Sequence, residues 1–514
     1  MAVIGAGVAG CALAAGLRRG GWEGSIDLWE AGRGPGGRAA TRRSRHDAGW
    51  RIDHGAPLLN LLEGPEPELV APLRSGGWIV PWREPTAMLQ GKGGLGPAQA
   101  DPLLGGSLYR GRQGMDDLCR GLLALAQADG PPHTLTSRYG TLVRDLEVRT
   151  GGGWRLADAT GAVLGEVDWL VLSGTLLAHP RAMERFGWSE VPLERASRAL
   201  GDGALETALA SLGRMEMEAR TNLMLTIDTG AAARWLDLPF RLLSLDAAAQ
   251  RHWGLRRLSI QPLADGRCTV VAHGGVSGPA ASGGPAASWG PAASGGARQD
   301  AAEIAALEGA VAGALAPWIG DRPTGRGALA GVAQRQLMRW GAAFPVTPGL
   351  APAAMVCPAS RVAFCGDFIE GPGFGRIEGA LRTAQSLAGR LLALVLLLCL
   401  VLGGPAMAAA AEAIPYRCDG DLLLATSDNG AVDAPGIPNT SAGTVPGATV
   451  LLEWRDLRLQ LPRTNNAGPP SYTDGLWWWS LEDPQQPRFL HRRGAIERFS
   501  CRAVPAAVPP ADGR

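Results

Sequence analysis

One uncharged run constrains this chain more than any other feature. No charged side chain occurs from residue 391 to residue 411, where leucine, valine and alanine predominate. At roughly 1.5 Å per residue, a helix of this length reaches across a bilayer core of about 30 Å. The segment "GGPAMA" adds a helix breaker and an A-x-A-like site, as in cleavable signals. We therefore predict a transmembrane or internal signal segment at 391–411; a buried terminal helix is the alternative.

The eight cysteines divide unevenly around this run. Five precede it, Cys399 lies inside it, and only Cys418 and Cys501 follow it. A scattered odd set is typical of a reducing compartment, whereas a lone pair near the ends of a small domain is typical of one disulfide in an oxidising compartment. We therefore predict a Cys418–Cys501 disulfide. Arginines ahead of the run favour a cytoplasmic N-terminal part, which makes the protein membrane-associated with a periplasmic tail.

Length and composition exclude several classes of protein. A chain of 514 residues is too long for a single core, so two to four domains are expected. The net charge of +1 and the 19% of charged residues give no indication of a nucleic-acid partner. The cysteines lack C-x-x-C spacing and the histidines lack ligand spacing, so no metal site is predicted.

The chain opens with a strand, a glycine-rich turn and a helix, "MAVIGAGVAGCALAAGLRRGG". Gly5 permits the tight turn, Gly7 lets the backbone approach a pyrophosphate, and Gly10 lets the helix pack on the strand. A second strand, "SIDLWE", ends at Glu30, where a carboxylate accepts hydrogen bonds from ribose hydroxyls and disfavours a 2′-phosphate. These residues predict an α/β Rossmann-type dinucleotide-binding domain.

A second glycine turn with cationic donors follows in "AGRGPGGRAATRR". It resembles the second motif of FAD-containing, amine-oxidase-like flavoproteins, and "RIDHGAPLL" is similar to their D-x-GA segment. The resemblance implies that FAD is the cofactor and that Gly37 and Arg38 bind it. His54 and Arg376 lie in or beside such motifs; packed or solvent-facing roles are expected for them. No catalytic residue is predicted.

Three further segments extend this resemblance over residues 1 to about 392. "GRQGMDDLCRGLLALAQ" is similar to the family's G-M-x-x-L helix, and "TLVRDLEVRT…DWLVLSG" to its returning meander, in which Val143 would meet the adenine. "RVAFCGDFIEGPGFGRIEGALRTAQ" matches the closing motif, which implies that Gly366 and Asp367 contact the flavin pyrophosphate and ribityl chain. In that family the helix that follows, here from about Ile377, would normally end near Leu392, whereas the apolar sequence continues beyond it.

The short domain and "QRQLMRWGAAFP" resemble the renalase-like branch in particular. That resemblance implies an oxidoreductase of small molecules, with reduced nicotinamides or amines as candidate substrates and NAD(P)H as a candidate electron donor. The predicted domain covers 1–395, with FAD-binding parts at about 1–60, 140–180 and 340–395 and an α+β substrate domain between them. The repeats "GPAASGGPAASWGPAASG" predict a flexible surface insert at 278–296.

The tail, 412–505, is rich in short strand signals such as "ATVLLEW" and "GLWWWSL". They predict a small all-β antiparallel barrel or sandwich. Tyr416, Trp454, Tyr472 and the final cysteine resemble the membrane-bound C-type lysozyme inhibitor family, which implies a C-type lysozyme as partner. The family's inhibitory loop has a basic residue where this chain has Ser471, and that departure argues against inhibition.

Two other interpretations of the whole chain stay open. The N-terminal fold could be a binding protein without redox activity. Alternatively, two unrelated reading frames are joined, in which case the tail is a separate lysozyme-binding module and the N-terminal part is cytoplasmic.

Overall fold

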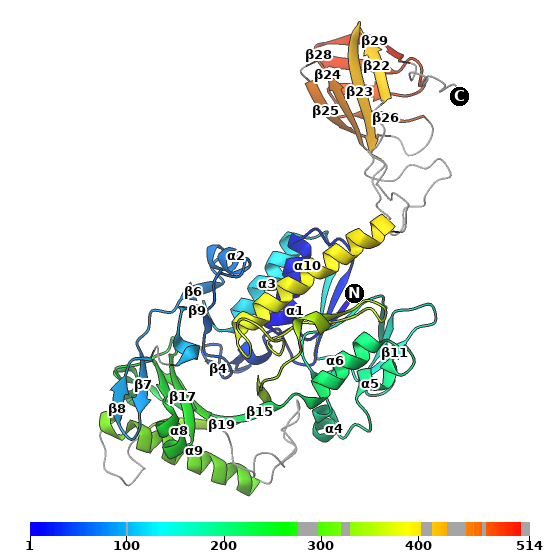
Figure 1. The fold of residues 1–514 in the computed structure, drawn as a ribbon. Coiled ribbons are helices and arrows are strands. Elements are labelled where there is room, and N and C mark those ends of the chain that lie inside the picture. Colours follow the sequence, from blue (N-terminus) through cyan, green and yellow to red (C-terminus); the bar gives the residue numbers. More distant parts are fainter. Residues whose placement is uncertain are drawn as a thin grey trace. The chain divides into compact units, whose positions relative to one another are not determined.

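The computed structural model describes residues 1–98, 101–275, 297–319, 329–401, 414–428, 449–455, 457–464 and 469–504. These residues form two compact units, Met1–Leu394 and Val395–Arg514 (Figure 1). The predicted insert at 278–296 and the end of the uncharged run, 402–411, lie outside the described residues.

The first unit is built on a mainly parallel sheet that contains the N-terminal strand. Its strand order is β10 (Leu135–Tyr139), β2 (Ile26–Glu30), β1 (Ala2–Ile4), β14 (Leu170–Leu172), β21 (Val362–Phe364), β20 (Val356–Cys357). The pairs from β10 to β21 are parallel, and β20 is antiparallel to β21. The central strands carry apolar residues on both faces because helices cover them. This arrangement confirms the predicted Rossmann-type sheet and the buried strand in "DWLVLS".

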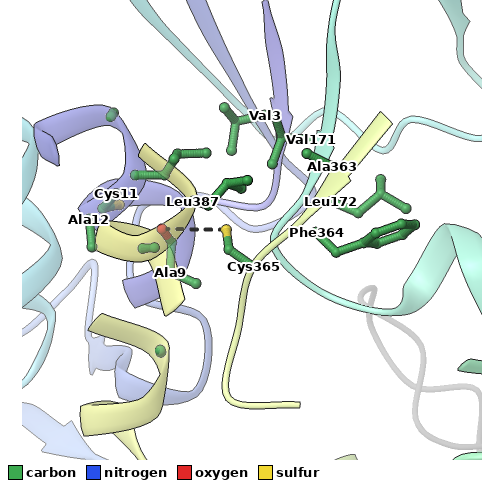
Figure 2. Close-up of a cluster of buried hydrophobic side chains, with 14 of the residues drawn as sticks. Val3, Ala9, Cys11, Ala12, Val171, Leu172, Ala363, Phe364, Cys365 and Leu387 are labelled. Atoms are coloured by element: carbon green, nitrogen blue, oxygen red, sulfur yellow. Dashed lines mark hydrogen bonds between the residues drawn. The ribbon is translucent and has the colours of Figure 1, made fainter. Parts of the chain in front are cut away.

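Helices α1 (Val8–Arg19), α3 (Asp116–Ala128) and α10 (Ile377–Val401) pack beside this sheet (Figure 1). Figure 2 shows Leu387 of α10 and Ala12 of α1 in one buried cluster with Val171 and Phe364 from the strands. Helices α1 and α10 approach closely at Gly20, the residue that follows α1. A Cβ on Gly20 would lie 2.2 Å from Leu392 Cδ1.

Helix α10 begins at the predicted residue, Ile377, and extends past Leu392, where the helix of the resembled family would normally end. The helix continues to Val401. Leucine and alanine beyond Leu392 are good helix formers, and the next glycine is Gly403.

By length and composition, one helix of the described residues is apolar enough to cross a membrane, Gln299–Ile319. It lies within α9 (Ala297–Ile319), whose Val311, Ala314 and Leu315 are buried in the core of the second sheet.

The second sheet of this unit forms the predicted substrate part. Its order is β19 (Val332–Pro345), β15 (Met217–Ile227), β18 (Cys268–Gly274), β17 (Leu255–Pro262), β16 (Leu242–Leu245), β7 (Thr86–Gln90), β8 (Gly94–Gly96). Side chains alternate between its faces, so Leu223 and Leu225 of β15 pack into a core with α9. Arg220 and Asn222 therefore point to the opposite face.

Smaller elements complete the unit. The strands are β3 (Thr41–Arg43), β4 (Arg51–Asp53), β5 (Leu59–Leu61), β6 (Ile79–Pro81), β9 (Ser107–Gly111), β11 (Asp145–Val148), β12 (Trp154–Ala157) and β13 (Val163–Val167). The helices are α2 (Val70–Ser75), α4 (Arg181–Phe186), α5 (Pro192–Ser197), α6 (Gly203–Arg214), α7 (Thr229–Leu236) and α8 (Ala247–Trp253). Strands β11, β12 and β13 form the predicted antiparallel meander.

The second unit is an antiparallel, nearly closed barrel of short strands. Its order is β25 (Leu457–Pro462), β24 (Thr449–Trp454), β23 (Asp421–Asp428), β22 (Ile414–Cys418), β29 (Ala495–Ala503), β28 (Arg488–Arg493), β27 (Trp477–Ser480), β26 (Ser471–Thr473). A bridge between Arg463 and Tyr472 joins the two edges. Tyr416, Trp479 and Phe489 fill the core, and a Cys418–Cys501 disulfide joins β22 to β29.

Candidate functional site

A cavity of about 1720 Å³ runs along the first unit, from the glycine turns to the second sheet. Pockets for small ligands usually measure about 300–1,000 Å³, so this one can hold a dinucleotide together with a small substrate. Eight of the nine residues predicted to bind the cofactor line it: Gly5, Gly7, Glu30, Gly37, Arg38, Val143, Gly366 and Asp367. Gly10 does not line it.

The first two glycine turns form one cradle. Gly7 and Gly36 form a parallel backbone bridge, and Gly36 N–H donates to Ala6 O at 2.9 Å. Gly5 has φ of +106° and Gly37 +54°, conformations that favour glycine. A Cβ on Gly10 would lie 2.1 Å from Gly5 O, so Gly10 has the packing role that the sequence predicted. A Cβ on Gly7 would have Gly37 Cα, at 3.9 Å, as its nearest neighbour. The fold itself therefore does not require glycine at residue 7. Glycine is needed there to keep this part of the cavity open.

Helix α1 starts directly at this cradle with its N-terminus free. Gly7 is the N-cap residue, and no side chain caps the helix within the described part of the chain. The first-turn N–H groups of a helix have no partner inside it, and the helix dipole adds a partial positive charge. This end of α1 therefore suits a phosphate group.

Glu30 lies at the carboxyl end of β2, where the sequence placed it. Its carboxylate accepts hydrogen bonds from Ala6 N–H at 2.9 Å and Gly32 N–H at 2.6 Å. These contacts fix both oxygens at the cavity wall, and each oxygen keeps a lone pair for a ribose hydroxyl. Val143 is buried and lines the same end, just after Thr141, whose N–H donates to Glu30 O at 2.9 Å.

Arg38 and Asp367, which were predicted separately, form an ion pair with each other. The guanidinium of Arg38 makes two parallel hydrogen bonds to the Asp367 carboxylate, one with Nη1···Oδ2 at 2.6 Å. Its Nη1 also donates to Ala343 O at 3.0 Å. The contact joins the second glycine turn to the closing motif, 329 residues apart in sequence. Arg38 consequently has fewer donors left for a cofactor than predicted.

The start of α10 closes the cavity near Gly366 and Arg376. Gly366 has φ of +151°, and a Cβ there would lie 2.4 Å from Phe368 Cε1. Of the two roles expected for Arg376, packed or solvent-facing, the structure shows the packed one. Its side chain is 11% exposed and pairs with Glu378 at 3.0 Å. The fully buried Glu378 carboxylate also pairs with Arg382 at 2.9 Å.

The face of the second sheet that looks into the cavity is polar although it is buried. In register across four strands lie Asn222 of β15, His273 of β18, Arg257 of β17 and Ser244 of β16. Arg220, two residues before Asn222, and Arg256, beside a register shift in β17, line the same space. We call Arg220, Asn222, Arg256, Arg257 and His273 the arginine wall.

Several polar atoms of the arginine wall have no partner among the described residues. They are Nε and Nη1 of Arg220, Oδ1 of Asn222, Nε of Arg257 and Nε2 of His273. Nearby, His54 Nδ1 is also unpartnered, and the His54 ring stacks on Trp340 at 5.4 Å. An unpaired buried polar atom costs free energy, so these atoms mark a place for a polar ligand.

Burial keeps both histidines uncharged at neutral pH. Burial and then the charges of Arg257 and Arg256 lower the pKa of His273 to about 3. Burial and then the charge of Arg42 lower the pKa of His54 to about 4. The positive charge of the wall therefore comes from its arginines. His54 is packed, as expected, and it also lines the cavity.

The arginine wall was missed in the sequence, although a signal for it exists. Arg220 and Asn222 stand two residues apart in "ARTNLMLTI", and the histidine of "CTVVAHG" lies in register with Asn222. Polar residues two apart in a strand normally predict a solvent-facing side of a sheet. Only the burial of Arg220, Asn222 and Arg257 shows that this face lines a cavity.

These observations fit a bound FAD. The glycine cradle, the uncapped end of α1 and Glu30 suit an adenosine diphosphate moiety. Gly366 and the start of α10 line another part of the same cavity, whose volume of about 1720 Å³ leaves room for a second, flavin-bearing half.

Comparison with known proteins supports part of this description. The model of an NAD(P)-binding Rossmann-like domain matches residues 3–69, which confirms the predicted dinucleotide-binding domain. Residues 426–501 match a domain of unknown function, DUF8671, so the predicted likeness of the tail to lysozyme inhibitors gains no support. No curated protein matches the chain.

The chain is similar to several solved structures. A protein from Exiguobacterium sp. 255-15 assigned as a protoporphyrinogen oxidase is 13% identical, with a TM-score of 0.50 over 76% of this chain and 98% of that chain. Cyclohexylamine oxidase from Brevibacterium oxydans IH-35A is 15% identical, with a TM-score of 0.49 over 77% and 98%. An oxidoreductase from Methanosarcina mazei is 14% identical, with a TM-score of 0.49 over 76% and 99%. At such identities the likeness to the first of these shows a common fold.

Proposed function

We propose that the first unit is an FAD-dependent oxidoreductase of a small molecule. The observation that carries the proposal is the single cavity that joins a pyrophosphate cradle to a second, polar end on a separate sheet. Bound FAD would accept two electrons from the substrate, and the protein would orient the two and exclude water. Gly5, Gly7, Gly37 and Glu30 would hold the adenosine diphosphate, and Gly366 with the start of α10 the remainder.

The experiment is to purify the full chain and record its visible spectrum before and after FAD is added. We expect flavin absorbance that survives gel filtration, and bleaching under anaerobic conditions by one member of a screen of reduced nicotinamides, NAD(P)H included, and amines. A folded chain that retains no flavin would contradict the proposal and favour a redox-inactive binding protein.

Glu30→Gln should weaken FAD binding about tenfold, while the protein stays folded. The amide keeps the size of the side chain but loses a charged acceptor and turns a donor toward Ala6 or Gly32 N–H; such hydrogen bonds are worth about 1.5–3 kcal/mol. Titration of the apoprotein with FAD, followed by flavin fluorescence, measures the change. Asp27→Asn, on the same strand but not lining the cavity, is the matched control and should bind FAD as wild type does.

For the tail we propose an exported binding module, with residues 391–411 as membrane segment or internal signal. Its support is the sequence resemblance to C-type lysozyme inhibitors and the lone pair of cysteines. Binding of a C-type lysozyme to the purified chain, measured by calorimetry, tests the partner, and absence of binding would contradict it. Mass spectrometry of the native products tests the arrangement, since two separate polypeptides would contradict a working fusion.

A further inference from the structure

The charges that line the cavity are strongly unbalanced. Its carboxylates are already engaged in the described part of the chain: Glu30 with backbone N–H groups, Asp116 with Arg43 and Arg120, Asp300 with Arg339, and Asp367 with Arg38. Among these carboxylates only Glu30 has no cationic partner in the described part of the chain, and its remaining lone pairs lie at the end of the cavity that suits the adenosine ribose. The other carboxylates of the described lining are paired with arginines and are not left to receive an ammonium group. Arginines, in contrast, line both ends.

At the arginine wall the positive charge exceeds its local compensation. Arg220 and Arg256 share one carboxylate, Glu218, with Arg256 Nη1 at 3.7 Å, and Arg257 has Asp101 at 3.2 Å. Neither Glu218 nor Asp101 lines the cavity, whereas all three arginines do. Three guanidinium groups thus line the cavity, and the two carboxylates that pair with them do not. The arginine wall and its partners together carry one net positive charge.

Two of these guanidinium groups, on Arg220 and Arg257, also have buried N–H donors without a partner among the described residues. The side chains of Arg220 and Arg257 are 6% and 8% exposed, yet Nε and Nη1 of Arg220 and Nε of Arg257 have no partner among the residues that the structure describes. Burial of an incompletely paired guanidinium is costly, and a planar carboxylate supplies the two acceptors that its fork fits. An ammonium ion there would meet like charge and no acceptor of opposite charge.

We propose that the arginine wall binds an organic carboxylate, so that the substrate is an acid and not a simple amine. Arg220 and Arg257 hold the carboxylate through their free N–H groups, and Asn222 and His273, in register between the strands, give further hydrogen bonds. Phe344, whose ring lies 4.8 Å from the Arg256 guanidinium, and Trp340 bound the apolar side of the same space. The claim that the bound acid is a substrate rests on the proposed function. The binding of the acid to the arginine wall does not need the flavin.

The test uses three probes of one shape and different charge: benzoate, benzamide and benzylamine. Each is titrated by calorimetry into the full chain, both FAD-loaded and flavin-free. We expect benzoate to bind at least tenfold more tightly than either of the others to both forms. Tighter binding of benzylamine, or binding of none of the three, would overturn the proposal. Loss of FAD on addition of benzoate would also overturn it, because the wall would then belong to the cofactor site.

Variants locate the effect. Arg220→Met should weaken benzoate about tenfold or more and leaves Glu218 paired with Arg256, so the fold is expected to persist. Arg257→Lys keeps the charge without the fork and should weaken benzoate less than Arg257→Met does. Arg155→Met, in an ion pair with Glu166 outside the cavity, is the control and should not change binding. Unchanged benzoate binding in both Arg220→Met and Arg257→Met contradicts the proposal. FAD retention, measured separately by absorbance, shows independently whether the proposed function fails.

Discussion

Gly7→Val should fold normally and lose FAD. The structure leaves room for a Cβ at residue 7 inside the protein, with its nearest neighbour at 3.9 Å, but that Cβ and its two methyl groups enter the part of the cavity that suits the pyrophosphate. Crowding of this kind costs about 1–3 kcal/mol, and displacement of the phosphate from the helix end costs up to about 2 kcal/mol more. The two together predict an FAD affinity roughly a hundredfold or more below that of wild type.

Circular dichroism and flavin fluorescence, measured on the same preparation, separate the two parts of this expectation. Gly10→Val is the contrasting variant: its side chain would meet Gly5 O at 2.1 Å, so it should lose the fold together with the cofactor. Undiminished flavin in folded Gly7→Val would show that the cofactor lies elsewhere in the cavity, and the assignment of the cradle would be wrong.

The dinucleotide end of the site could be predicted because it depends on local sequence. The turn between β1 and α1 and the carboxylate at the end of β2 are both set within 30 residues of the N-terminus, where glycine spacing and strand pattern determine the backbone. The turn residues and Glu30 consequently lie where the sequence placed them.

The arginine wall could not be predicted because it is assembled by pairing distant strands. Asn222, His273 and Arg257 become neighbours only when β15, β18 and β17 take their register. In the sequence they are isolated polar residues in strands that could face solvent, and nothing local says that a cavity covers them. The Arg38–Asp367 pair is similar: each residue was correctly placed at the cavity, but their contact with each other depends on the folding of the whole unit.

The two ends of the cavity also differ in which substitutions can reveal how a ligand is bound. At the cradle the backbone does the binding, so only added bulk or a lost carboxylate is informative. At the arginine wall the proposed contacts come from side chains, so charge and shape can be changed separately. A variant that loses benzoate but keeps FAD, together with one that loses FAD but keeps benzoate, would establish two subsites in one cavity.

Reduction of the Cys418–Cys501 disulfide should destabilise the tail by about 4 kcal/mol. The bond closes a loop of 83 residues, and the chain entropy removed from the unfolded state accounts for a free energy of this size. A barrel this small buries a modest part of its surface, so the loss is a large share of its stability. In a reducing compartment the tail should therefore be close to unfolding.

Limited proteolysis of the full chain with and without a reductant measures this effect, and the first unit provides an internal control. Its described cysteines, Cys11, Cys119, Cys268, Cys357 and Cys365, are free and buried, so the reductant has no disulfide to break there. We expect the reductant to accelerate cleavage within 414–504 at least tenfold and to leave cleavage within the first unit unchanged. A Cys418→Ser, Cys501→Ser double variant should be cleaved at the fast rate without any reductant. Equal protease resistance of the oxidised, reduced and double-variant tails would mean that the barrel core around Trp479 suffices alone, and the cysteine pair would then no longer argue for an oxidising compartment beyond residue 411.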